Sequence, residues 1–215
     1  MFDNVTLKIY DPPRNYIPGR DITDKYRSDI NTYRGKIKNM GIYKNLNSLV
    51  ICGSLAKYLY GENITPLTRE EVRMSIEKLE QDINLDLKKA IVTSAEFGTS
   101  IIIKEKPFEY LNLFGNTKRL TRIEYSKWTG VETVTYTSKK GSFEFIGYDK
   151  VKEMLDRKQE IPSLFAGANV LRLEFKIRNR KGIKSIFKND LTAQDLLMKI
   201  FIRDFKNYFM INTQL

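Results

Sequence analysis

The segment from Asn169 to Arg178, NVLRLEFKIR, alternates apolar and charged residues almost without a break. This period of two predicts a β-strand with one face on a hydrophobic core, because apolar positions in an amphipathic helix recur every three or four residues. The apolar face carries Leu171, Leu173, Phe175 and Ile177. The charged face carries Arg172, Glu174, Lys176 and Arg178. This strand is therefore predicted to place apolar side chains on a core and charged side chains on the opposite face of the sheet.

Further strands are predicted at 5–11, in two runs between 35 and 52, and at 91–104. In the last of these, Ser94, Glu96, Gly98 and Ser100 share a face that is small and polar apart from one carboxylate. The runs VETVTYTS and SFEFIGY, on either side of Lys139-Lys140-Gly141, predict a hairpin. Residues 53–63 fit either a short helix or a second hairpin.

Three helices are predicted. Thr68 and Glu71 form a capping box, and the apolar spacing that follows predicts a helix to about Asn84. DKVKEMLDRK, from Asp149, predicts a second helix, and the apolar run from Leu191 predicts a third. The expected class is α+β, with helices on one face of two antiparallel sheet units or one larger sheet. We treat the chain as one domain, with two related sheet halves at about 1–115 and 116–215 as the finer division.

Composition excludes several kinds of chemistry. The chain has no histidine and one cysteine, Cys52, so Ser-His-Asp triads, zinc sites built on histidine or thiolates, and disulfides within the chain are excluded. Any metal would lie on carboxylates and carbonyls, which indicates Mg²⁺ or Mn²⁺. A net charge of +11 favours a polyanion partner, although a lysine-rich proteome would give the same balance. No signal peptide or long apolar run is evident, so we expect a soluble, cytoplasmic protein without a membrane partner.

The candidate chemistry centres on Tyr148, where a predicted strand meets a predicted helix. Asp149 and Glu153 are four residues apart and share a helix face, while Glu96 and Glu174 lie on polar strand faces. Acids from adjacent strands could hold one divalent ion beneath the phenol, an arrangement suited to phosphoryl transfer. A nearby lysine such as Lys152 could lower the pKa of the phenol.

Each of these residues also has an ordinary structural interpretation. Tyr148 could be a packing residue. Glu174 could form charge pairs on a solvated face, and Asp149 could be a helix-start acid.

Taken together, GSLAKYLYGEN, TSAEFGTSI, TVTYTSKKGSFEFIGYDKVKE and VLRLEFKIRNRKGIKSIF resemble the rolling-circle replication initiators of the filamentous-phage gene II type and their plasmid relatives. The resemblance covers about 50–191 and implies that Tyr148 is the nicking nucleophile, with Tyr136 as second choice. It implies metal ligands at Glu96, Glu174 and Glu153, to which the helix spacing adds Asp149. It also places Lys57 and Asn63 in a stretch that contacts DNA or supports the sheet.

Two residues depart from the family pattern: Glu96 stands where aspartate is usual, and Ser94 where arginine is common. The chain is also shorter than is usual for the family. The resemblance implies an enzyme that nicks and rejoins origin or single-stranded DNA through a 5′-phosphotyrosine link, leaving a 3′ hydroxyl for the host replication machinery. A catalytically silent DNA-binding regulator and a mobilisation relaxase remain as alternatives. The predicted DNA contacts are Lys57, Asn63, Lys150, Lys152, Arg172, Lys176, Arg178 and Arg180.

Overall fold

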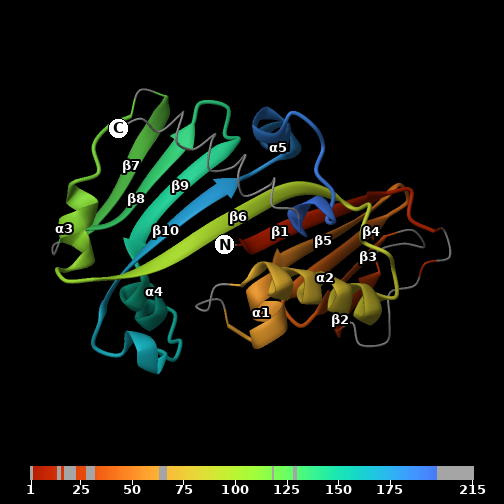
Figure 1. Cartoon of the computed structure of the whole chain (residues 1–215), viewed down its shortest axis with the longest axis horizontal. Helices are drawn as coiled ribbons and strands as arrows, with labels where there is room; N and C mark the ends of the chain where they lie inside the picture. Colours follow the sequence, from red (N-terminus) through yellow and green to blue (C-terminus); the bar gives the residue numbers. More distant parts are fainter. Residues whose placement is uncertain are drawn as a thin grey trace. The chain divides into compact units, whose positions relative to one another are not determined.

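The structure, a computed structural model, describes residues 2–13, 16, 23–27, 32–62, 67–117, 119–127 and 130–197. The chain divides into two compact units: unit 1 comprises Met1–Glu96 with Asn179–Gln214, and unit 2 comprises Phe97–Arg178. Each unit contains an antiparallel sheet and helices (Figure 1), which confirms the predicted α+β class.

Unit 1 has a sheet in which neighbouring strands follow the order β2-β3-β4-β5-β1-β6. Their bounds are β1 Phe2–Tyr10, β2 Thr23–Arg27, β3 Tyr33–Ile37, β4 Met40–Asn45, β5 Ser48–Ser54 and β6 Ile91–Ile103. The helices of this unit are α1 Leu55–Tyr60, α2 Arg69–Ile83 and α5 Arg180–Phe187, with a short 3-10 turn, η2, at Asp195–Leu197.

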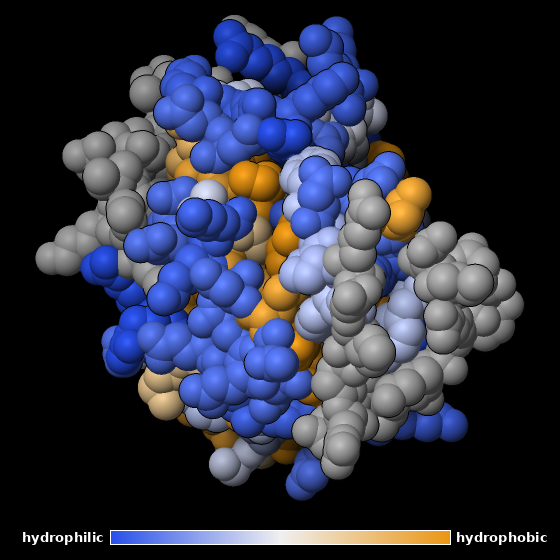
Figure 2. All heavy atoms as spheres, turned by 90° about the vertical axis from the view of Figure 1, so that its right-hand side faces the viewer, coloured by the Kyte–Doolittle hydropathy of each residue, from blue (hydrophilic) through white to orange (hydrophobic). Residues whose placement is uncertain are grey.

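One face of the unit 1 sheet forms the core of the unit. Burial alternates along β1, where Val5 and Leu7 are enclosed and Thr6 and Lys8 are less covered. Met40 and Ile42 of β4 and Leu49 and Ile51 of β5 are fully buried, and α1 and α2 lie over one face of this sheet (Figure 1). On the opposite face, Arg34 and Lys36 of β3 and Tyr43 of β4 are exposed. Figure 2 shows the side of the molecule where β3 and β4 lie, with mostly hydrophilic residues and a narrow band of hydrophobic ones.

Local capping signals determine where the helices of unit 1 begin and end. Ser54 accepts a hydrogen bond from the backbone N–H of Lys57, and Gly61 ends the helix in the left-handed region, so the described part of this segment, 53–62, contains the helix of the two alternatives. The capping box of Thr68 and Glu71 is confirmed at the start of α2. Of the apolar helix predicted from Leu191, residues 191–197 form a bridge and η2, and the remainder lies outside the described residues.

Unit 2 has the strand order β6-β10-β9-β8-β7, so β6 contributes residues to both units. The bounds are β7 Leu120–Lys127, β8 Gly130–Ser138, β9 Phe143–Asp149 and β10 Asn169–Ile177. The helices are α3 Pro107–Asn112 and α4 Lys150–Asp156, with a 3-10 turn, η1, at Ser163–Phe165. The predicted hairpin across residues 139–141 is confirmed as β8 and β9.

The core of unit 2 lies on the face that carries Leu171 of β10. Leu111 of α3 packs there with Val131, Val134 and Tyr136 of β8. The other face of β9 and β10 carries Tyr148, Arg172, Glu174 and Lys176, and α4 begins directly after β9.

Candidate active site

Tyr148 lies next to the end of β9, directly before the residue that caps α4. The carboxylate of Asp149 caps that helix by accepting a hydrogen bond from the backbone N–H of Lys152 at 3.0 Å. In the antiparallel ladder Tyr148 is paired with Arg172 of β10, so both side chains lie on the same face of the sheet and Glu174 is the diagonal neighbour. The phenol Oη donates a hydrogen bond to Oε1 of Glu174 at 2.7 Å. Strand pairing and the helix cap thus fix the position of this tyrosine.

Glu174 is surrounded by cationic side chains on the same strand. Nε of Arg172 lies 3.4 Å from Oε1 of Glu174, and Nζ of Lys176 lies 3.2 Å from Oε2. Arg172 is 1% exposed and Glu174 is 6% exposed. The alternative interpretation of this strand face as solvated is therefore wrong at Arg172 and Glu174. Alternation shows which side chains share a face, but it does not show whether that face is covered.

A glycine on β6 makes room for the buried guanidinium. A Cβ added to Gly98 would lie 2.1 Å from Nη2 and 2.5 Å from Cζ of Arg172, so the guanidinium rests on the Gly98 backbone. Nη1 of Arg172 also donates to the hydroxyl of Ser100 at 3.2 Å. Gly98 and Ser100, which belong to the small polar face predicted for this strand, thus form the surface that Arg172 packs against.

The electrostatics of this network keep the tyrosine protonated and the glutamate charged. Burial raises the pKa of Tyr148 far above its usual value, and the charge of Glu174 and the hydrogen bond to it add to the rise. Burial also raises the pKa of Glu174, but the charge of Lys176, the hydrogen bond from Tyr148 and the charge of Arg172 outweigh it and hold that pKa below its usual value. In this state Tyr148 is a hydrogen-bond donor and not a nucleophile.

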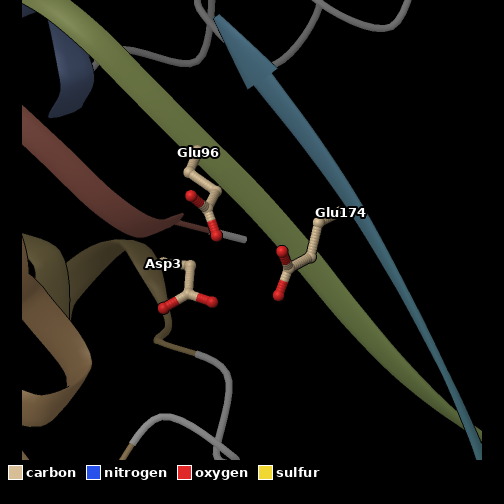
Figure 3. Close-up of side chains that lie close together, drawn as sticks. All are labelled: Asp3, Glu96 and Glu174. Carbon is tan, nitrogen blue, oxygen red and sulfur yellow. The ribbon is translucent and has the colours of Figure 1, made fainter. Parts of the chain in front are cut away.

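Three carboxylates from three strands lie together beside this network. One carboxylate oxygen from each of Asp3, Glu96 and Glu174 lies within 4.8 Å of the other two (Figure 3). Asp3 belongs to β1, Glu96 to β6 and Glu174 to β10. Like charges at this separation repel one another, and a divalent cation would relieve the repulsion. An all-oxygen donor set of this kind fits a hard ion such as Mg²⁺ or Mn²⁺.

Asp3 was not among the residues predicted from the sequence. It is 4% exposed, and the hydroxyl of Ser54 donates to its Oδ1 at 3.4 Å. A signal for it was present, because Asp3 falls on the same side of the β1 alternation as Val5 and Leu7, both of them buried. A carboxylate in line with core residues is costly to bury without compensation, so it indicates a special environment.

Asp149 and Glu153, the other two predicted metal ligands, do not belong to the group of three carboxylates. Asp149 serves as the helix cap, and Glu153 lies in ion pairs with Lys150 at 2.8 Å and Arg157 at 2.7 Å. The charge of Glu153 nevertheless contributes to the raised pKa of Tyr148. Lys152 is ion-paired with Glu132, and its charge is not among those that shift the pKa of Tyr148.

Tyr136, the second-choice nucleophile, lies on the other face of the sheet. It pairs with Phe145 of β9, three residues from Tyr148, so the two tyrosines point to opposite sides. Its side chain is 5% exposed within the unit 2 core, and its hydroxyl donates to the carbonyl of Gly115 at 2.6 Å. This environment is that of a buried tyrosine with a satisfied hydroxyl.

The predicted DNA contacts fall into two groups by exposure. Arg172 and Lys150 are buried, with their cationic groups turned to carboxylates inside the protein. The remaining cations, Lys57, Lys152, Lys176, Arg178 and Arg180, are at least partly exposed. Of these, Arg178 is paired with Glu144 at 2.5 Å and Arg180 with Asp190 at 2.5 Å. Asn63 lies outside the described residues.

Comparison with known proteins identifies the family of this chain. The family model for the N-terminal region of the phage replication-associated protein, the gene II protein, matches residues 13–194. The chain belongs to this family. The match spans most of the chain and includes Tyr148, Glu96 and Glu174, and it confirms the resemblance to rolling-circle replication initiators that the motifs indicated.

A solved structure has the same fold. The rolling circle replication initiator protein from Geobacillus stearothermophilus superposes with a TM-score of 0.50 over 99% of this chain and 84% of that one, at 10% identity. At this identity the likeness concerns the fold alone. No curated protein sequence matches the chain. Among the described residues, no helix has both the length and the apolar character needed to cross a membrane.

Proposed function

We propose that this member of the gene II protein family initiates rolling-circle replication by nicking one DNA strand with Tyr148 and later rejoining it. The observation that carries the proposal is the 2.7 Å hydrogen bond from the Tyr148 phenol to Glu174, a member of the three-carboxylate group. It joins a nucleophile of the right kind to a proton acceptor that is also a candidate metal ligand.

Asp3, Glu96 and Glu174 would hold Mg²⁺ or Mn²⁺, and a cation there would neutralise charge on the scissile phosphate and favour the phenolate. The hydrogen bond to Glu174 gives the phenol proton a direct acceptor as Tyr148 attacks. A bond forms between Oη and phosphorus while the bond from phosphorus to the 3′ oxygen breaks, and that oxygen is protonated by water. The phosphotyrosine ester conserves the energy of the cleaved bond, so a 3′ hydroxyl can later attack it and restore the strand.

The two cations that flank Glu174 on β10 have a supporting role in this mechanism. Arg172 and Lys176 hold Glu174 charged, and Arg172 also lies beside Tyr148 in the strand ladder. Fixing both groups before DNA arrives reduces the reorganisation required in the transition state. The free 3′ hydroxyl left by the nick would serve the host replication machinery as a primer, and origin DNA is the expected substrate.

The test uses a random-sequence, single-stranded oligonucleotide library with fixed flanks and a label at the 3′ end. A 5′-phosphotyrosine link retains the 3′ fragment, so wild-type protein with Mg²⁺ or Mn²⁺ should give a labelled adduct that survives denaturation. The adduct should disappear in Tyr148→Phe and persist in Tyr136→Phe, with the label on the peptide that contains Tyr148. Persistence of the adduct in Tyr148→Phe would refute Tyr148 as the nucleophile. Retarded migration without an adduct in either metal would support the silent DNA-binding alternative.

A further inference from the structure

We propose that the outer face of the unit 1 sheet is a platform that binds single-stranded DNA by stacking bases on Tyr43 and Tyr10. This surface is distinct from the candidate active site and contains none of its residues. The proposed function supplies the reason to expect DNA as the ligand. The binding itself requires neither the nucleophile nor a metal.

The platform is built from residues that lie side by side across four strands. In one row, Arg34 of β3 pairs with Tyr43 of β4, Tyr43 with Val50 of β5, and Val50 with Lys8 of β1. Directly paired residues in an antiparallel sheet point to the same face, so this row forms one continuous surface.

The neighbouring row runs parallel to the first across the same strands. Its members in order are Lys36, Gly41, Cys52 and Thr6. The platform thus includes at least two residues from each of the four strands.

Tyr43 presents an aromatic ring on this surface. A Cβ added to Gly41 would lie 3.1 Å from Cε2 and 3.2 Å from Oη of Tyr43, so the ring lies down over the glycine and does not stand up from the sheet. The residue nevertheless stays 43% exposed, and the guanidinium of Arg34 lies 5.9 Å from the ring centroid. A ring held along the sheet with a cation at its side offers a stacking surface to an unpaired base.

Tyr10, at the end of β1, is a second exposed tyrosine with cations beside its ring. It is 46% exposed, with Nζ of Lys8 at 4.8 Å and Cζ of Arg180 at 5.7 Å from its ring centroid. Its hydroxyl accepts a hydrogen bond from Nη1 of Arg180 at 3.3 Å. The two tyrosines are separated by two strand spacings and two residues, about 12 Å between Cα atoms, so they would contact different bases.

The charge of the platform fits a polyanion. Its two rows include Arg34, Lys36 and Lys8, and no row member is acidic. Arg180, beside Tyr10, is ion-paired with Asp190 and adds less to this charge. Arg34 and Lys36 are exposed. Exposed rings with cations beside them favour a single strand over a duplex, since the base faces of a duplex are already stacked on one another.

The test measures binding of a fluorescent single-stranded oligonucleotide by anisotropy, in the Tyr148→Phe background and in EDTA so that no cleavage occurs. Tyr43→Leu and Tyr10→Leu should each weaken binding about 10-fold, the loss expected for one stacked base. Tyr60→Leu is the matched control, because Tyr60 is 46% exposed but lies on α1, and it should bind as the parent does. Arg34→Gln should reduce the slope of log affinity against log salt by about 0.7, as expected for one lost phosphate contact on a single strand.

Unchanged affinity in both leucine variants, with circular dichroism showing that they are folded, would overturn the proposal. So would a matched duplex that binds as tightly as the single strand and loses the same affinity in Tyr43→Leu. Failure of the nicking proposal is distinguishable, since it would remove the covalent adduct and leave this binding intact.

Discussion

The polar sheet face around Tyr148 in unit 2 and the outer sheet face around Tyr43 in unit 1 use the same residue types in opposite ways. On the first, Arg172 is 1% exposed and the tyrosine hydroxyl is bonded to a buried glutamate. On the second, Arg34 is exposed and Tyr43 is 43% exposed. Tyrosine, arginine and lysine on a strand therefore indicate nothing specific until their burial is known. Burial with mutual contacts suits chemistry, whereas exposure suits reversible binding.

A glycine underlies each arrangement. Gly98 leaves space for the guanidinium of Arg172, and Gly41 leaves space for the ring of Tyr43. The two sites differ in how tightly that space is filled, with the nearest atom 2.1 Å from an added Cβ at Gly98 and 3.1 Å at Gly41. Substitutions at these and neighbouring positions therefore test the comparison directly.

The largest effect is expected from Glu174→Gln, which removes a charge from the three-carboxylate group. Adduct formation should fall below detection, because this residue is both a candidate metal ligand and the hydrogen-bond acceptor of Tyr148. In the wild type, Mg²⁺ at about 100 times its dissociation constant should stabilise the fold by about 2.7 kcal/mol, a rise in melting temperature of about 5 to 10 °C. The variant should lose this rise but retain its binding to single-stranded DNA. An unchanged metal response would remove Glu174 from the proposed site.

Gly98→Ala should have the next largest effect. The added methyl group would overlap with the guanidinium of Arg172, so this side chain must move. Its hydrogen bonds to Glu174 and Ser100 are then lost. We expect a loss of about 1 to 3 kcal/mol in the free energy of unfolding and about 100-fold in the rate of adduct formation. Gly115→Ala is the control, because nothing lies within 4 Å of its added Cβ. Equal behaviour of the two variants in urea melts and single-turnover assays would contradict the packing argument.

The phenol of Tyr148 should titrate at a higher pH than an ordinary tyrosine in the metal-free protein, because burial and Glu174 raise its pKa. In Glu174→Gln the titration should move to lower pH, since the charge that opposes the phenolate is gone. The contribution of the raised pKa to stability is fully present below the unfolded pKa of about 10 and declines as pH rises above it. The measurement is NMR of ¹³C-labelled tyrosine, with the signal assigned by its absence in Tyr148→Phe. A shift in the opposite direction would show that Glu174 does not control this group.

The smallest effect is expected from Gly41→Ala, which crowds the ring of Tyr43 by only a few tenths of an ångström. The ring can turn aside, so the fold and adduct formation should be unchanged while affinity for the single-stranded oligonucleotide falls about two- to threefold. Anisotropy titrations in EDTA measure this change. A loss as large as that expected for Tyr43→Leu would mean that the ring position is as tightly determined as that of Arg172, and the contrast between the two faces would fail.

Much of this arrangement was predictable from the sequence, because strand periodicity is a local property. The alternation of residues 169–178 and the capping box at Thr68 gave β10 and the start of α2. The convergence of Glu96 with Glu174 followed from placing both on polar strand faces. Asp3 was missed because its neighbours along β1 look like an ordinary core strand, and its partners are distant in sequence. The burial of Arg172 was missed because the space for it is created by Gly98 on another strand.

One further consequence follows from the course of β6. Glu96 and Gly98 stand two residues apart and so project to the same side of this strand. Inserting or deleting a single residue between them would send one of them to the reverse side. During divergence, exchanges of side chain along β6 are therefore more tolerable than changes of its length. The number of residues between Glu96 and Gly98 should therefore be kept more strictly than the side chains themselves. The glutamate at position 96, where aspartate was expected, agrees with this.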